Sequence, residues 1–244
     1  MPTVAELTDA YGNVLVAPRA GDGVCRTCFN LTDGYERCYA CVHGGRGLDL
    51  VVPISYSVAG EQLNHALVSY KRGPMPAATE LGLQLAAVLW RFLAAHERCV
   101  AGTLGVAAIP LVTTVPSNDP ARDDAHPLHE LVQRTVKPTS ERFRRLLQRT
   151  ERRAVPHVFC DERYAATTLL DGEAVLLIDD TWTTGANAQS AATALKLAGA
   201  GPVAAVVIGR HLNRQWGGND RRLNRLPTPF DWGGCVLCQP LDSR

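Results

Sequence analysis

The stretch VLLIDDTWTTGANAQSAATAL, residues 175–195, decides the fold of this chain. Four apolar residues lead directly into Asp179 and Asp180, and a loop of threonines and a glycine then opens an alanine-rich helical pattern. In open α/β sheets, ligands bind beyond the carboxyl ends of the strands, which is where these two carboxylates stand. The start of the following helix offers unpaired backbone N–H groups and a positive dipole end, and both favour a phosphate.

Two carboxylates beside a phosphate cradle predict a ligand with two different halves. The carboxylates would repel a bare polyphosphate, so they should hold sugar hydroxyls or a metal ion. Thr181, Thr183 and Thr184 add hydroxyl donors, and Gly185 lets the backbone approach closely or adopt a positive φ. A ribose 5-phosphate fits both halves, whereas the simpler alternative is a turn that ends a strand and caps a helix. No GxxxxGK[ST] phosphate loop occurs, and no GxGxxG motif follows a strand.

The composition describes a globular chain without an overall charge bias. Of its 244 residues, 46% are hydrophobic and 20% are charged, enough for one full core and a small appended module. Lys and Arg number 25 against 24 for Asp and Glu, so any affinity for nucleic acid or a membrane surface must be local. The first residues lack the features of an export signal, and no run of about 18 apolar residues occurs, so we expect a cytoplasmic protein.

Four cysteines near the N-terminus have the spacing of a metal site. CRTCFNLTDGYERCYAC contains Cys25, Cys28, Cys38 and Cys41, which form two CxxC knuckles nine residues apart. Each knuckle lets two thiolates reach one ion from a tight turn, and two knuckles complete the tetrahedral site of a structural Zn²⁺. The alternatives are disulfides, free thiols or an iron–sulfur cluster.

The other four cysteines are less informative. The C-terminal GGCVLC contains Cys235 and Cys238, which supply half of a metal site. A surface pair of reduced thiols and a shared or second metal site both remain open for them. Cys99, at the end of a helical pattern, and Cys160, in an apolar segment, are expected to be packing residues.

Strand patterns alternate with helical patterns after the cysteine-rich segment. This alternation predicts an α/β fold with a mainly parallel sheet covered on both faces. The expected divisions are a zinc-binding module over residues 1–48, a main domain over 49–214 and an irregular extension over 215–244. Helices are expected at 79–99 with Thr79 as N-cap, at 127–136, 140–153 and 189–198, and strands at 155–160, 174–179 and 203–209.

These motifs resemble those of a known family. VLLIDDTWTTGAN resembles the signature that binds phosphoribosyl pyrophosphate (PRPP) in the type I phosphoribosyltransferases. The whole chain is similar to the ComF-like branch, in which a four-cysteine zinc module precedes that domain. LNHALVSYKRG, VTTVPS and VVIGRHL resemble, respectively, the branch's lysine segment, pyrophosphate-loop region and last core strand with its arginine. The resemblance implies a sheet of the type I phosphoribosyltransferase kind.

The resemblance also implies a reaction and a set of site residues. The chain would bind PRPP with Mg²⁺ and transfer phosphoribosyl to an acceptor, releasing pyrophosphate. Asp179 and Asp180 would hold the ribose 2- and 3-hydroxyls and act catalytically, because negative charge stabilises an oxocarbenium-like transition state. Mg²⁺ would keep several waters and bridge substrate oxygens. The residues implied to bind PRPP around its 5-phosphate are Thr181, Trp182, Thr183, Thr184, Gly185, Ala186 and Asn187.

The chain departs from the family pattern at two places. Asn187 stands where the family usually has Thr or Ser, and its amide can still donate to a phosphate. Where related sequences tend to be basic, this chain reads Arg122, Asp123, Asp124, Ala125. Those carboxylates would oppose a departing pyrophosphate unless magnesium intervenes. They favour the alternative function, a non-catalytic PRPP-binding or DNA-handling accessory protein of the competence type; no pattern identifies the acceptor or the oligomeric state.

An arginine-rich segment follows the predicted pyrophosphate loop. SERFRRLLQRTERRAV contains Arg142, Arg144, Arg145, Arg149, Arg152 and Arg153. On the expected helix, all of these except Arg144 would lie along one face. That face could be simply solvated, form a mobile basic flap over pyrophosphate, or bind nucleic-acid phosphates. His126, His129 and His157 are isolated, and only His126 lies near the predicted loop.

Overall fold

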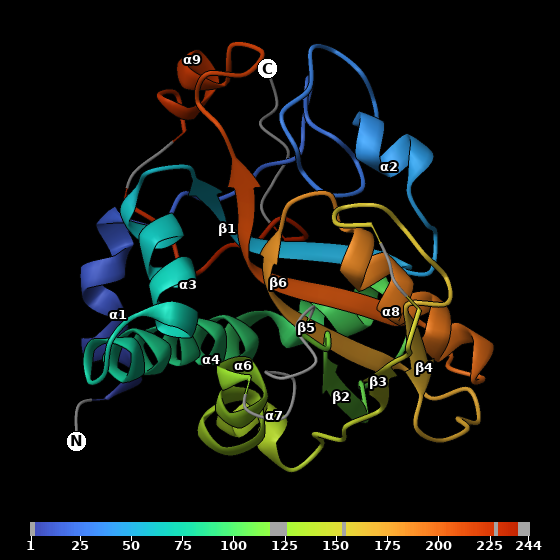
Figure 1. Cartoon of the computed structure of the whole chain (residues 1–244). Coiled ribbons are helices and arrows are strands. Elements are labelled where there is room, and N and C mark those ends of the chain that lie inside the picture. Colours follow the sequence, from blue (N-terminus) through green and yellow to red (C-terminus); the bar gives the residue numbers. More distant parts are fainter. Residues whose placement is uncertain (1–2, 118–125, 153–154, 227–228, 239–244) are drawn as a thin grey trace.

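The computed structural model describes residues 3–117, 126–152, 155–226 and 229–238. Its centre is a four-stranded sheet in which every neighbouring pair of strands is parallel (Figure 1). This confirms the predicted α/β class with a parallel sheet. The strands, in spatial order, are β1 (Leu50–Val58), β6 (Val203–Leu212), β5 (Val175–Trp182) and β2 (Leu111–Thr114).

Helices and a small hairpin surround this sheet. The long helices are α3 (Gln62–Arg72), α4 (Ala77–Thr103) and α8 (Ala186–Leu197). The short ones are α1 (Val4–Asp9), η1 (Ala10–Asn13), α2 (Tyr39–His43), α6 (Pro127–Glu130), η2 (Leu131–Thr135), α7 (Lys137–Ser140) and α9 (Asn219–Leu223). The antiparallel hairpin pairs β3 (Leu147–Arg149) with β4 (Tyr164–Ala166). Among the described residues, no helix combines the length and apolar character needed to cross a bilayer.

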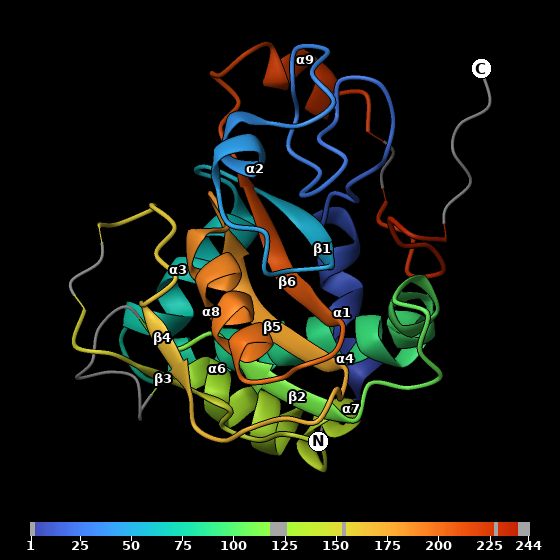
Figure 2. The same ribbon diagram turned by 90° about the vertical axis from the view of Figure 1, so that its right-hand side faces the viewer.

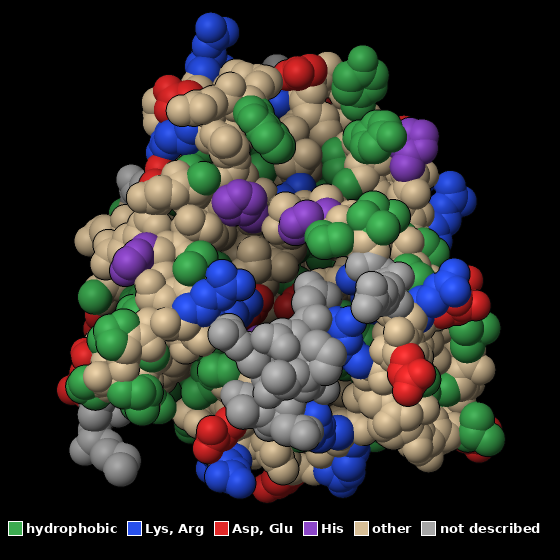
Figure 3. Space-filling model, viewed as in Figure 1, with side chains coloured by type: hydrophobic (Ala, Val, Ile, Leu, Met, Phe, Trp, Pro, Cys, Tyr) green, Lys and Arg blue, Asp and Glu red, His purple; other side chains and the backbone are tan. Residues whose placement is uncertain are grey.

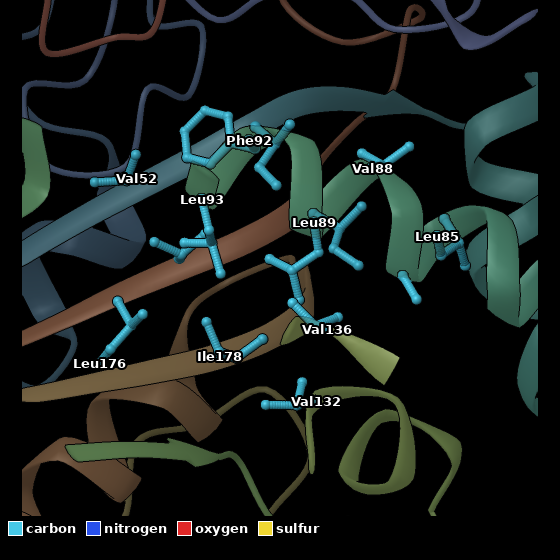
Figure 4. Close-up of a cluster of buried hydrophobic side chains, with 14 of the residues drawn as sticks. Val52, Leu85, Val88, Leu89, Phe92, Leu93, Val132, Val136, Leu176 and Ile178 are labelled. Atoms are coloured by element: carbon cyan, nitrogen blue, oxygen red, sulfur yellow. The ribbon is translucent and has the colours of Figure 1, made fainter. Parts of the chain in front are cut away.

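The two faces of the sheet carry separate apolar cores because successive residues of a strand point to opposite sides. Leu176 and Ile178 of β5 join the core under α4, where they lie below Leu89 and Leu93 (Figure 4). Val175 and Leu177 join the other core, which is formed mainly with the alanines of α8. β5 is therefore buried on both sides, and its carboxyl end has a fixed position.

Helix α4 was expected, but its start was not correctly predicted. The helix begins at Ala77, directly after Pro76, and Thr79 lies within the first turn instead of serving as the N-cap. The hydroxyl of Thr79 contacts the sulfur of Met75 and makes no cap bond.

The predicted helix over residues 140–153 is wrong. Of the described residues 140–152, Ser140 alone is helical, at the end of α7, and the segment then runs along strand β2. The N–H of Val112 donates to the carbonyl of Arg142, and the N–H of Arg144 donates to the carbonyl of Val112. β2 is the edge strand of the sheet, and pairing its free backbone groups outweighs the local helical spacing.

The predicted strand over residues 155–160 is also wrong. This segment consists of a turn and irregular backbone, and the strand lies four residues later, at β4. Val155 and Val158 are exposed, and their carbonyls accept hydrogen bonds from the side chain of Arg163 instead of from a neighbouring strand.

Candidate functional site

The two adjacent aspartates lie at the carboxyl end of β5 and have different partners. Asp180 is 3% exposed, and its carboxylate accepts a hydrogen bond from the hydroxyl of Tyr70 and forms an ion pair with Lys71, both on α3. Asp179 is partly exposed and accepts a hydrogen bond from the N–H of Asp180 at 2.9 Å. The carboxylate of Asp180 is thus fixed by two side chains of α3, whereas that of Asp179 lines a cavity beside the loop.

The same surroundings separate the pKa values of the two carboxyls. Burial, followed by the negative charge of Asp180, raises the pKa of Asp179 to about 8. Burial also opposes ionisation of Asp180, but the charge and hydrogen bond of Lys71 and the hydroxyl of Tyr70 outweigh it and lower its pKa. These surroundings therefore favour the ionised form of Asp180 and oppose ionisation of Asp179.

The loop after β5 turns sharply at Gly185. This residue has φ of 81° and ψ of 3°, the left-handed region, and it is the N-cap of α8. A Cβ built on Gly185 would lie 2.0 Å from Cζ2 of Trp182, whose indole is 1% exposed. Both the backbone conformation and the close contact with Trp182 therefore require glycine here.

A small cavity lies between the acidic pair and the start of α8. Its volume is about 130 Å³, and it is lined by Pro156, His157, Asp179, Thr181, Thr183, Thr184, Gly185, Ala186, Asn187 and Ala188. Of the nine residues predicted for catalysis and PRPP binding, residues 179–187, only Asp180 and Trp182 do not line it. Asp180 is turned toward α3, and Trp182 lies buried beneath the loop, where its Nε1 has no hydrogen-bond partner among the described residues.

Arg163 supports the loop and was missed by the sequence analysis. It is 2% exposed, and its guanidinium donates to Oδ1 of Asn187 at 2.7 Å and to the carbonyl of Val158 at 2.7 Å. These bonds hold the segment beside His157 against the loop, and Thr184 adds a hydrogen bond to the carbonyl of His157 at 3.1 Å. No motif in the sequence marked Arg163, because its partner in the loop, Asn187, lies 24 residues further along the chain. Tyr70 was missed for the same reason.

A larger cavity adjoins the loop cavity, since His157, Thr183 and Thr184 line both. Its volume is about 620 Å³, and its walls include Tyr39 from α2 and Trp216, both of which are exposed aromatic residues. The space-filling view, drawn from the same side as Figure 1, shows a hollow near the middle of the molecule that is bordered by basic and histidine side chains (Figure 3). There is room beside the loop for a second ligand.

The four N-terminal cysteines converge as the spacing predicted. Cys25, Cys28, Cys38 and Cys41 are buried, and one sulfur atom from each lies within 4.8 Å of all the others. The sulfur atoms of Cys28 and Cys38 are 3.7 Å apart, about the ligand separation in a tetrahedral zinc site with ~2.3 Å bonds, and none of the eight cysteines forms a disulfide. Hydrogen bonds from the other three sulfurs, Cys28 first, lower the pKa of Cys25. This cluster, called the cysteine cluster below, could hold a metal ion such as zinc.

Arg210 on β6 joins the cysteine cluster to the strand that carries the acidic pair. Its side chain is 3% exposed; Nε donates to the carbonyl of Cys28 and Nη1 to the carbonyl of Trp182, each at 3.2 Å. The hydroxyl of Tyr56 on β1 donates to the carbonyl of Phe29 at 2.7 Å. The cysteine-rich segment is therefore packed over the carboxyl ends of β1 and β6, on the same side as the loop (Figure 1).

The arginine-rich segment does not form the predicted single face. Arg142 makes a bidentate ion pair with Glu97 of α4, with N–O distances of 2.6 and 2.8 Å. Arg149 donates to the carbonyl of Ser117, and Arg152 pairs with Glu162 at the surface. Arg153 and the acidic stretch Arg122, Asp123, Asp124 and Ala125 lie outside the described residues.

The three histidines lie around the site in different ways. His126 caps α6, because its Nδ1 accepts a hydrogen bond from the N–H of Leu128 at 3.2 Å. His129 is buried and hydrogen-bonds to Thr114 at the end of β2. His157, with a φ of 62°, lines both cavities.

No model of a known protein family matches the chain, and a search of curated proteins finds no match either.

Proposed function

We propose that this chain binds PRPP together with Mg²⁺ at the loop formed by residues 181–187 and transfers the phosphoribosyl group to an acceptor, releasing pyrophosphate. One observation carries the proposal: one carboxylate of the acidic pair, that of Asp179, and a glycine-capped helix N-terminus line the same small cavity. Asp179 lines this cavity together with Thr183, Thr184 and Gly185. A ligand with hydroxyls at one end and a phosphate at the other matches this lining.

The phosphate would lie at the start of α8. This helix has 12 residues, and its N-cap residue, Gly185, has no side chain that could accept a hydrogen bond from the first turn. The N–H of Ala186 donates to the hydroxyl of Thr184 at 3.3 Å. The N–H groups and the positive dipole end of such a turn favour an anion. The hydroxyls of Thr181 and Thr183 provide further donors in the same cavity, whereas the hydroxyl of Thr184 donates to the carbonyl of His157.

The ribose would lie against the acidic pair. Its hydroxyls would donate to the carboxyl of Asp179, while Tyr70 and Lys71 hold Asp180 in place. In the reaction, the bond between the anomeric carbon and the pyrophosphate oxygen breaks, its electron pair leaves with pyrophosphate, and a lone pair of the acceptor forms the new bond. The negative charge at Asp180 would stabilise the positive charge that develops on the ribose. Mg²⁺, when bound, would neutralise charge on the leaving pyrophosphate.

The acceptor would occupy the larger adjoining cavity. This cavity shares Thr183 and Thr184 with the loop and has a volume of about 620 Å³. Tyr39 and Trp216 on its walls offer apolar surface to a planar ring. The cysteine cluster would hold a structural Zn²⁺ that fixes α2, and with it Tyr39, on this side of the sheet.

Calorimetric titration of PRPP with Mg²⁺ tests the proposal. Binding is expected for the wild type and for Asp171→Asn, a control at an exposed turn, and not for the Asp179→Asn, Asp180→Asn double variant. Circular dichroism establishes that each variant is folded. No binding to the wild type, or equal binding to the double variant, would contradict the proposed site.

The alternative, a PRPP-binding accessory protein without turnover, is separated by a second measurement. Pyrophosphate release is followed with a panel of nucleobases and amines as acceptors. Turnover with one of them supports the transferase. PRPP binding without pyrophosphate release from any acceptor favours the accessory role. The geometry gives no added support to nucleic-acid binding, since Arg142 and Arg152 are both paired with glutamates.

A further inference from the structure

A second set of metal-ligating side chains lies away from the loop, on helix α4. His96 and Cys99 are three residues apart on one face of the helix, and the C-terminal CxxC pair, Cys235 and Cys238, lies close to them. The C-terminal segment that contains the pair, red in Figure 2, runs beside α4. One ligand atom from each of the four residues lies within 4.8 Å of all the others, as in the cysteine cluster. We propose that this second cluster binds a zinc ion through three thiolates and one imidazole.

The distances within the second cluster suit a tetrahedral ion. The two sulfur atoms of the CxxC pair are 3.4 Å apart, and Nδ1 of His96 lies 3.8 Å from Sγ of Cys238 and 4.0 Å from Sγ of Cys99. With bonds of about 2.3 Å to sulfur and about 2.0 Å to nitrogen, tetrahedral ligands are about 3.5 to 3.8 Å apart. Shifts of a few tenths of an ångström would complete the site.

The orientation of the imidazole favours metal binding. Nε2 of His96 lies 2.9 Å from the carbonyl oxygen of Trp232, and because a carbonyl can only accept, Nε2 carries the hydrogen. In the neutral ring, Nδ1 then has a free lone pair and faces the sulfur atoms. A ligand histidine that donates its other N–H to a backbone carbonyl is the usual outer support of a protein zinc site. The N–H of Cys235 donates to Sγ of Cys238 at 3.3 Å, which is the corresponding support for a thiolate.

A disulfide explains this arrangement less well. The sulfur atoms of Cys235 and Cys238 are separated by 3.4 Å, whereas a disulfide bond is about 2.05 Å long. A disulfide between Cys235 and Cys238 would also not account for the presence of Cys99 and the buried His96 in the same cluster. Mixed thiolate and imidazole ligands in a tetrahedron are typical of zinc.

The second zinc would attach the C-terminal segment to the main core. Residues 229–238 contain no helix or strand, so few backbone hydrogen bonds hold them. The N–H of Phe230 donates to the carbonyl of Gly12 at 2.7 Å, and the guanidinium of Arg91 lies 4.6 Å from the ring centre of Trp232. Cys235 belongs to the core beneath α4, while the first cysteine cluster belongs to the core on the opposite face of the sheet. Each face would then carry one zinc.

Metal analysis of the full-length chain, purified without chelators, tests the proposal. Two zinc ions per chain are expected for the wild type and for Cys160→Ser, a cysteine outside both clusters. One is expected for the Cys235→Ser, Cys238→Ser double variant. A wild type with one zinc, lost in a Cys25→Ser, Cys28→Ser variant, would overturn the second site, as would iron with acid-labile sulfide in place of the second zinc.

Cobalt titration of the wild type keeps the test independent of variants that fail to fold. Zinc is removed from the folded chain under reducing conditions, and Co²⁺ is added while thiolate-to-metal and ligand-field absorption are recorded. Two equivalents with tetrahedral absorption support the proposal, and saturation at one equivalent contradicts it. In His96→Ala, the second equivalent alone is expected to weaken or disappear, whereas an unchanged titration would show that His96 is not a ligand.

Discussion

Replacing Gly185 by alanine tests how the loop after β5 is built. Alanine at a φ of 81° costs about 1–2 kcal/mol, because the left-handed region crowds its Cβ. The new Cβ would also lie 2.0 Å from Cζ2 of the buried Trp182, and overpacking of this kind costs about 1–3 kcal/mol. Gly185→Ala should therefore lower the free energy of unfolding by about 2–5 kcal/mol, measured by urea denaturation.

Two controls separate the backbone term from the contact term. Gly172 has a φ of 80° and no heavy atom within 4 Å of a built Cβ, so Gly172→Ala should cost the backbone term alone, about 1–2 kcal/mol. In a Trp182→Phe background, Gly185→Ala should cost no more than Gly172→Ala, because Cζ2 is gone. The substitution to Phe breaks no hydrogen bond within the described structure, since Nε1 of Trp182 has none there. Equal costs for Gly185→Ala and Gly172→Ala in the wild type would refute the contact with Trp182.

Three further predictions concern charge and metal. Since the native pKa of Asp179 is raised from 3.8 to about 8, the native state keeps a proton that the unfolded state loses. The free energy of unfolding, measured by urea denaturation, should therefore fall as pH rises from about 4 to about 8. Asp179→Asn should make this pH dependence weaker, and a pH dependence unchanged in the variant would contradict the prediction. Arg142→Ala leaves Glu97 half-buried without its partner and should destabilise the chain by about 2–3 kcal/mol, against about 0.5 or less for the exposed Arg134→Ala, both read from denaturation midpoints. Cys28→Ser should remove one zinc per chain and lower the thermal midpoint, as seen by metal analysis and calorimetry; an unchanged zinc content would exclude it as a ligand.

The parts of the fold that could be predicted are those encoded by local pattern. The apolar run into Asp179 and Asp180 predicted the strand and the helix after it, because a buried parallel strand and an alanine-rich helix each have their own periodicity. The N-terminal cysteines were found because all four lie within 17 residues of sequence.

The parts that could not be predicted depend on residues distant in the chain. The arginine-rich segment has helical spacing, but the unpaired edge of β2 determines its structure. Tyr70 and Arg163 join the site through partners more than twenty residues away. The HxxC spacing of His96 and Cys99 on one helix was a usable signal for the second cluster, but its other half lies beyond residue 230.

The buried side chain of Arg210 has a thermodynamic consequence. It contacts the backbone of Cys28 on one side and that of Trp182 on the other, so order at either place favours order at the other. If zinc binds at the cysteine cluster and PRPP at the loop, as proposed, the two binding equilibria would be coupled through this contact, and such coupling is reciprocal. The factor by which bound zinc raised the affinity for PRPP would equal the factor by which bound PRPP raised the affinity for zinc. Withdrawal of zinc from this chain would then also weaken its binding of the phosphorylated sugar.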